Sequence, residues 1–116
     1  MIFLEVEYEV KIVFRGREVD VNALLSEKVW FTVMSEKLFL EKFGPVWMSL
    51  KKPNLFVIKD KKINVDKFAT VGIKIGSRAY KETVYISDDL INVLEKDIDL
   101  IIGKKFLERN KIRIMA

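Results

Sequence analysis

Two adjoining stretches decide the fold: ALLSEKVWFTVM at residues 23–34 and SEKLFLEKF at residues 35–43. In the first stretch, a polar Ser-Glu-Lys tripeptide separates two apolar parts, and the aromatic and β-branched residues 30–34 favour a short strand. The second stretch starts with Ser35, a favourable helix N-cap, and Gly44 follows it where helices commonly end. The segment therefore predicts strand, polar loop, short strand and helix in succession.

The residues before this segment predict a β-hairpin. Apolar and charged residues alternate over residues 4–14, which is typical of a strand with one buried face. The alternation resumes over residues 19–25, and Gly16 can adopt the positive φ of a tight turn between the two strands. A hairpin thus leads directly into the polar tripeptide.

The rest of the chain also predicts short strands. The expected elements are a loop at 51–54, a hairpin of 55–58 with 63–65 and a charged tip, a strand pair 71–75 with 83–86, a turn at Asp88-Asp89, a buried strand at 97–103, a helix at 104–109 with Asn110 in the left-handed C′ position, and a final strand at 111–115. We therefore predict a single domain over residues 1–116, all-β with one or two short helices, closed into a β-barrel.

Composition excludes several chemistries. The chain has no Cys and no His, so it lacks disulfides, thiol catalysis, the commonest general base and the commonest zinc ligand. The net charge of +4 comes from 21 basic and 17 acidic residues that are interspersed, which favours an ordinary mixed-charge surface over a nucleic-acid site. No apolar run approaches the roughly 20 residues of a membrane helix, and no signal peptide is recognisable. We expect a cytoplasmic protein, and the Lys, Glu and Ile content suits a thermophile.

Two stretches together resemble the retropepsin-like (retroviral-type) aspartic proteases. In that family a hairpin leads into Ala-Leu-Val-Asp-Thr-Gly-Ala, then two residues, then Thr-Val-Ile and a helix, and residues 23–43 match this order without a gap. Near its C-terminus the family has an apolar strand, Leu-Gly, a short helix ending in Phe-Leu and a last strand, to which LIIGKKFLERNKI at 100–112 is similar. The hairpin at 55–65 stands where the family has its flap. The resemblance covers most of the chain and implies a closed barrel of the acid-protease type.

The chain departs from the family at the active-site motif. The resemblance places Ser26 at the catalytic Asp position, Glu27 at the following Thr or Ser, and Lys28 at the Gly. The family's chemistry needs two carboxylates, one from each half-site, that share a proton. A serine hydroxyl performs neither proton transfer near neutral pH, and Lys28 adds a Cβ and a charge where glycine permits close approach. The resemblance therefore implies vestigial site positions at Ser26, Glu27 and Lys28, with no catalytic residue, cofactor or metal.

Other site hypotheses remain as alternatives. Glu27 could supply a carboxylate, or Ser26 and Lys28 could form a Ser–Lys nucleophilic pair. The carboxylate sets Asp88-Asp89 and Asp97/Asp99 could hold a hard cation, although a turn and the outward face of a strand explain them better. Three aromatic side chains beside lysines could stack on nucleic-acid bases, although aromatics in so small a domain usually belong to the core: Trp30, Phe31 and Trp47.

These observations predict a catalytically inactive retropepsin-like domain, a pseudoenzyme that acts as a homodimeric structural or peptide-binding module. The family pairs terminal strands between two chains, so residues 111–115 and the N-terminal Ile2-Phe3-Leu4 could form isologous contacts here. Across the two-fold axis, Glu27 of one chain could pair with Lys28 of the other. The alternatives are an active peptidase with a non-standard site and a basic nucleic-acid-binding β-barrel.

Overall fold

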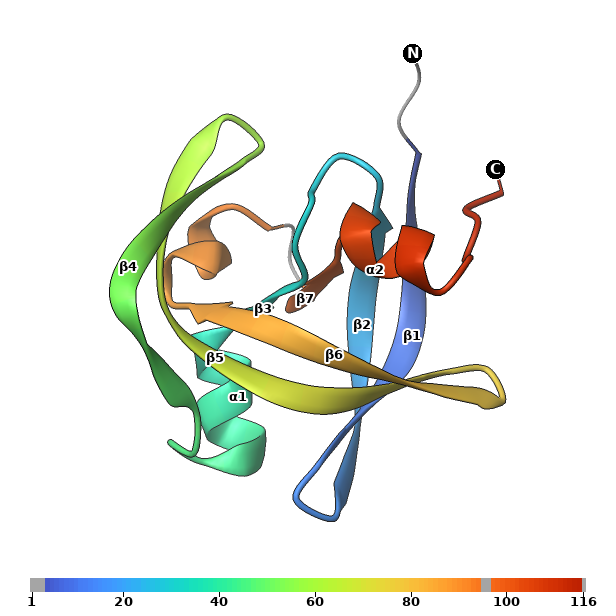
Figure 1. The fold of residues 1–116 in the computed structure, drawn as a ribbon, viewed down its shortest axis with the longest axis horizontal. Coiled ribbons are helices and arrows are strands. Elements are labelled where there is room, and N and C mark those ends of the chain that lie inside the picture. The colour runs from blue at the N-terminus through green and yellow to red at the C-terminus, as the bar shows by residue number, and fades with distance from the viewer. Residues whose placement is uncertain (1–3, 95–96, 116) are drawn as a thin grey trace.

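The computed structural model describes residues 4–94 and 97–115. Figure 1 shows its elements, which in chain order are β1 (Glu5–Phe14), β2 (Arg17–Ser26), β3 (Val33–Ser35), α1 (Glu36–Phe43), β4 (Met48–Ile58), β5 (Lys61–Ile75), β6 (Arg78–Ser87), the 3₁₀ helix η1 (Asp89–Asn92), β7 (Leu100–Ile102) and α2 (Lys104–Arg109). No helix among these residues is long and apolar enough to span a membrane.

The strands form one sheet that closes into a ring. Their order is β1-β2-β7-β3-β6-β5-β4, and a further pairing of Lys11–Val13 in β1 with β5 joins the two sides. Among the described strands β4 pairs only with β5, so it lies outside the ring as an edge strand. The predicted all-β architecture, closed on itself and carrying short helices, is confirmed.

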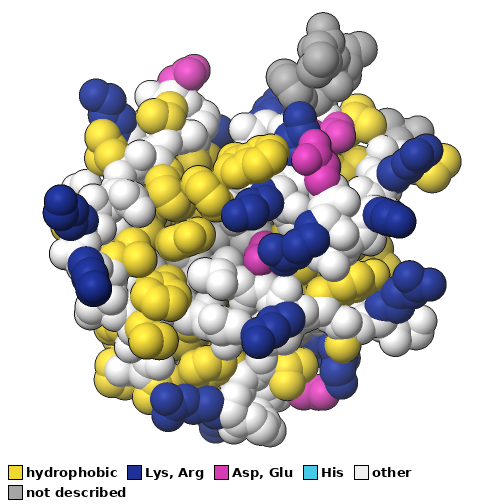
Figure 2. Space-filling model, viewed as in Figure 1, with side chains coloured by type: hydrophobic (Ala, Val, Ile, Leu, Met, Phe, Trp, Pro, Cys, Tyr) yellow, Lys and Arg dark blue, Asp and Glu magenta, His cyan; other side chains and the backbone are white. Residues whose placement is uncertain are grey.

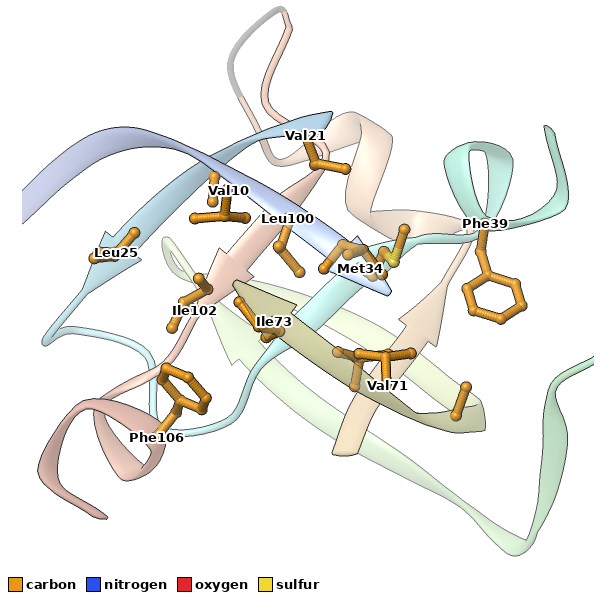
Figure 3. Close-up of a cluster of buried hydrophobic side chains, with 14 of the residues drawn as sticks. Val10, Val21, Leu25, Met34, Phe39, Val71, Ile73, Leu100, Ile102 and Phe106 are labelled. Atoms are coloured by element: carbon orange, nitrogen blue, oxygen red, sulfur yellow. The ribbon is translucent and has the colours of Figure 1, made fainter. Parts of the chain in front are cut away.

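The ring encloses the larger of two apolar clusters. Its members come from alternate positions of the strands, as the period of two requires, and from one side of each α-helix. Figure 3 shows Met34 and Ile73 inside the ring, with Phe39 of α1 and Phe106 of α2 packed at its two ends. The second cluster lies under the β4–β5 hairpin and includes Ile58, Ile63 and Ile101. The hairpin thus has an apolar base of its own.

The first hairpin and the first helix agree with the sequence prediction. β1 and β2 pair in antiparallel register across Arg15-Gly16, and Gly16 has a φ of 79°. The Ser35 hydroxyl accepts a hydrogen bond from the Leu38 amide at 3.1 Å, which caps α1. Gly44, with a φ of 82°, ends the helix. These elements depend on signals that lie within a few residues of each other.

The middle of the chain forms longer strands than predicted. The predicted loop at 51–54 is wrong, because β4 continues through Pro53 with a register shift between Ser49 and Asn54. Proline lacks an amide hydrogen, and the outer edge of an edge strand needs none. The predicted strands 63–65 and 71–75 are parts of one strand, β5. β3 starts at Val33 rather than at Trp30.

The C-terminal part departs most from the prediction. The buried strand expected at 97–103 is limited to β7, because Asp97 has a left-handed φ of 74° and Asp99 precedes the strand. Asp97 and Asp99 therefore do not form the outward face of a strand. α2 ends as predicted, but Lys111, with a φ of 56°, takes the left-handed position instead of Asn110. Residues 111–115 form no strand within this chain.

Candidate functional site

Ser26 is the last residue of β2 and is completely buried. Its hydroxyl donates a hydrogen bond to Glu5 Oε2 at 2.6 Å and accepts one from the Lys28 amide at 3.1 Å. The Lys28 ammonium lies 3.4 Å from Glu5 Oε1. Ser26, Glu5 and Lys28 therefore form one hydrogen-bonded charge cluster, which we call the floor cluster.

Glu5 is the member of the floor cluster that the sequence prediction missed. It lies directly opposite Ser26 in the β1–β2 register. The signal was present, because the tight turn pairs Phe14 with Arg17, and counting back along both strands brings Glu5 to Ser26. A carboxylate from the neighbouring strand thus lies within hydrogen-bond distance of the Ser26 hydroxyl.

Glu27 lies outside the floor cluster. Its Oε1 accepts a hydrogen bond from the Leu4 amide at 2.9 Å, and its own amide donates to the Leu4 carbonyl at 3.0 Å. Glu27 and Lys28 therefore both have partners within the chain, and neither needs the other across a two-fold axis to be satisfied. Ile2 and Phe3, the other residues of the predicted N-terminal contact, lie outside the described residues.

A cleft of about 380 Å³ opens above the floor cluster. Its walls combine the floor cluster's two charged residues, apolar side chains of β2, β7 and the loop after β2, and the tip of the β4–β5 hairpin, which we call the flap: Glu5, Leu24, Lys28, Val29, Val57, Ile58, Lys59, Asp60 and Ile101. A second hollow of about 200 Å³ shares Glu5, Leu24 and Lys59 with it. In Figure 1 the hairpin tip and the loop after β2 stand at the same end of the molecule. The fold thus forms a groove between flap and floor.

The flap turn has an unusual backbone. Lys59 and Asp60 have φ values of 52° and 64°, so both lie in the left-handed region that tight hairpin turns require. This region costs a non-glycine residue about 1–2 kcal/mol. The first hairpin turn also places a charged residue, Arg15, in the left-handed region, but there and in the β5–β6 turn a glycine, Gly16 or Gly76, shares the turn, whereas this turn has none. Lys59 and Asp60 at the flap tip therefore occupy a backbone conformation that is unfavourable for residues with a side chain.

The floor cluster does not have the geometry of a Ser–Lys nucleophile. The Ser26 hydroxyl is buried and committed to Glu5, and the hydrogen bond that Ser26 accepts from Lys28 comes from the main chain. A lysine base must be desolvated, whereas the Lys28 side chain is 57% exposed and faces the Glu5 carboxylate. The cluster instead presents one carboxylate and one ammonium to the cleft.

The loop that follows the floor cluster is held rigidly against α2. The Lys104 amide donates to the Val29 carbonyl at 2.7 Å, and the Lys105 amide donates to the Trp30 carbonyl at 3.0 Å. A Cβ on Gly103 would lie 2.4 Å from the Phe31 carbonyl oxygen, so only glycine permits this approach. The wall of the cleft is therefore fixed by main-chain contacts.

A buried network fastens the same loop from the other side. Thr32 donates to Glu82 Oε2 at 2.8 Å and accepts from the Gly103 amide at 3.2 Å. Arg109 of α2 donates to Glu82 Oε1 at 2.9 Å, and the Thr83 amide donates to the same oxygen at 3.0 Å. We call Thr32, Glu82 and Arg109 the buried network.

The acidic pairs Asp88-Asp89 and Asp97/Asp99 lie in a turn and beside a shallow hollow. No group of three or more acidic residues among the described residues is arranged to hold a metal ion. Asp89 opens η1 and accepts a hydrogen bond from the Asn64 amide at 2.9 Å, so the prediction of a turn at Asp88-Asp89 is confirmed. Asp97 and Asp99 line a shallow hollow beside β2.

The aromatic residues are mostly packed against each other. Phe31 stacks on Phe56 with ring centroids 5.1 Å apart, and Trp47 packs against Phe39 at 6.0 Å. Trp30 is the exposed one of the three predicted stacking residues. The interpretation of Phe31 and Trp47 as packing residues is therefore supported.

Comparison with known proteins identifies the fold. No protein-family model and no curated protein matches this sequence. Among solved structures, the EIAV protease complexed with the inhibitor HBY-793 matches with a TM-score of 0.64 and 13% identity, over 97% of this chain and 94% of that one. The resemblance that residues 23–43 and 100–112 suggested is thus confirmed at the level of the fold. This chain has the fold of a retroviral protease, with Ser26 at the end of its second strand and Glu27 and Lys28 in the loop that follows.

Proposed function

We propose that this protein is a homodimeric, non-catalytic retropepsin-like domain that binds an extended peptide or protein segment between its flap and its floor. The observation that carries the proposal is the state of Ser26. It is buried, it donates to Glu5, and Glu5 faces the Lys28 ammonium. Aspartic-protease chemistry needs two carboxylates that share a proton, and a serine hydroxyl that is committed to Glu5 supplies neither.

The cleft itself supports a binding role. It keeps a volume of about 380 Å³ with apolar walls from Leu24, Val29 and Ile101, and rigid main-chain contacts fix its loop. An extended chain can add to a sheet edge through main-chain hydrogen bonds, and pockets for alternate side chains then give specificity. Binding without cleavage is therefore compatible with every contact described for the floor cluster.

The C-terminal segment supports the homodimer. Residues 111–115 are not hydrogen-bonded as a strand in the described chain, although apolar and charged residues alternate along them. Ile112 and Ile114 pack against the main core, while Met115 is 87% exposed. Pairing with the same segment of a second copy would satisfy this backbone and cover Met115. Sedimentation equilibrium tests this: we expect a dimer, and dissociation in Met115→Glu, whereas Lys37→Glu on the exposed side of α1 should leave it intact.

A cleavage assay tests the absence of catalysis. The protein is incubated with casein and with a peptide library across a wide pH range, and new termini are counted by mass spectrometry. We expect no cleavage above that of a Ser26→Ala control. Cleavage that disappears in Ser26→Ala or Glu27→Gln would sink the proposal.

A second candidate is a peptidase that uses Glu5. The observation that favours it is the 2.6 Å contact between Glu5 Oε2 and the residue at the aspartate position, at the base of the cleft. If a dimer brought two Glu5 carboxylates together, they could share a proton as the family's aspartates do. Cleavage that is abolished by Glu5→Gln but survives Glu27→Gln would favour this candidate over the binding module.

A further inference from the structure

We propose that the ligand of the cleft is an extended acidic segment with alternating apolar residues, which adds as a strand to the outer edge of β4. The inference rests on the proposed binding function and names the chemical class of the ligand. Its physical basis is the β4–β5 hairpin, from Met48 to Asp66, which we call the flap arm. Three properties of the flap arm point the same way: an open sheet edge, exposed apolar side chains and an excess of lysine.

The open edge is confined to one half of β4. In the first half, Pro53 and the register shift between Ser49 and Asn54 interrupt the regular row of main-chain groups. Such irregularities, with lysines beside them, are how proteins protect an edge from pairing. In the second half, residues 54–58 pair regularly with β5, so their other side offers regularly spaced amides and carbonyls. A strand can therefore add to residues 54–58.

The exposed side chains of residues 54–58 can pack against an apolar face of the ligand. Leu55 and Val57 are 55% and 63% exposed, and as alternate residues they lie on the same face of β4. Val57 and Ile58 also belong to the wall of the cleft. A strand that pairs with this edge would thus continue into the cleft and cover both exposed side chains.

The charge of the flap arm selects an acidic ligand. Four exposed lysines lie on it without an ion-pair or hydrogen-bond partner in the described part of the chain: Lys51, Lys52, Lys59 and Lys62. Asp60 and Asp66 are the acids of the arm. Figure 2 shows hydrophobic side chains gathered over this side of the molecule, with Lys and Arg at their margin and few acids. Like charges would oppose pairing of this edge with a second copy, so an acidic partner is the better fit.

Nucleic acid fits this surface less well. Single-stranded binding needs exposed ring faces on which bases stack. Phe56 stacks on Phe31, the Lys105 ammonium lies 5.7 Å from the centre of the same ring, and Tyr85 packs edge-on against both rings. The half-exposed Trp30 lies on the loop beside α2 rather than on the flap arm. The surface therefore offers lysines and aliphatic side chains rather than a stacking platform.

The test compares fluorescein-labelled heptapeptides with Val at alternate positions and Glu, Gln or Lys between them. Anisotropy titrations are run at low salt and at about 1 M NaCl, where the Debye length falls to about 3 Å. We expect the Glu peptide to bind about tenfold more tightly than the Gln peptide at low salt, and the advantage to vanish at high salt. The double variant Lys59→Glu/Lys62→Glu should lose that advantage, whereas Arg78→Glu, at the far β5–β6 turn, should keep it.

Each outcome bears on a different part of the inference. Equal or tighter binding of the Lys peptide would overturn the acidic preference and leave the binding function standing. Equal binding of a Glu peptide with N-methylated main-chain amides would overturn strand addition. If an oligouridine displaces the peptide and binds more tightly than it, the partner of this surface is a nucleic acid rather than a protein. If no peptide binds at either salt concentration, the proposed function fails as well.

Discussion

The floor cluster and the buried network have the same chemical parts and different surroundings. In each, a hydroxyl donates to a carboxylate that faces a cation: Ser26, Glu5 and Lys28 in one, Thr32, Glu82 and Arg109 in the other. The carboxylate side chain is 22% exposed in Glu5 and 9% exposed in Glu82. The Glu82 carboxylate also accepts from the Thr83 amide. The two sites therefore differ chiefly in the burial of their carboxylate.

The largest effect should come from the buried network. Glu82→Ala would leave the buried Thr32 hydroxyl and the Thr83 amide without their acceptor, whereas the 47% exposed Arg109 keeps the Lys81 carbonyl. We expect a loss of about 2–3 kcal/mol in the free energy of unfolding, because each buried polar group left unsatisfied costs about 1–3 kcal/mol. Urea denaturation measures it. Glu7→Ala, an exposed residue of β1, is the matched control and should change stability little. A loss below that of Glu5→Ala would contradict the contrast between the two sites.

An acid introduced at Ser26 should destabilise the floor cluster. Ser26→Asp would place a second carboxylate beside Glu5, and we expect a loss of about 1–2 kcal/mol at neutral pH from like-charge repulsion and burial. Repulsion raises the pKa of a carboxyl group in the folded state, so the loss should shrink as the pH falls. The double variant Ser26→Asp/Glu5→Gln should recover most of the stability. If Ser26→Asp loses the same stability with and without Glu5→Gln, repulsion from Glu5 is not the cause of that loss.

The ion pairs of Lys67 should have an effect on stability of intermediate size. Its ammonium lies 2.8 Å from Glu36 and 2.9 Å from Asp66, and these hydrogen bonds raise its pKa from 10.5 to about 12. A raised lysine pKa contributes stability below pH 10.5 that is lost as the pH rises through about 12. We expect Lys67→Met to cost about 1 kcal/mol at neutral pH. An NMR titration of the Lys67 side chain should give a midpoint near 12, and a midpoint at the ordinary lysine value would contradict these contacts.

The smallest effect should come from Lys28. Its side chain is 57% exposed, so solvent screens its pair with Glu5, and Lys28→Ala should change the free energy of unfolding by no more than about 0.5 kcal/mol. Thermal and urea unfolding measure this. A loss comparable to that of Glu82→Ala would mean that the floor cluster is a structural element rather than a presented charge pair.

The sequence by itself determined the local elements of the N-terminal part. Alternation, the Gly16 turn and the Ser35 cap specify the first hairpin and α1, because each signal acts within a few residues. That Ser26, Glu27 and Lys28 stand at the positions of the family's acid, hydroxyl and glycine stays a prediction from the sequence resemblance.

Only the tertiary structure decided how these residues are used. The Thr32 contacts with Glu82 and Gly103 span 50 and 71 residues, and no local pattern predicts them. The edge position of β4 follows from closure of the ring, which also explains why Pro53 lies within a strand. The role of Glu5 follows from the hairpin register, which places its carboxylate on Ser26. The energies of these contacts depend on burial, and burial is a property of the assembled sheet.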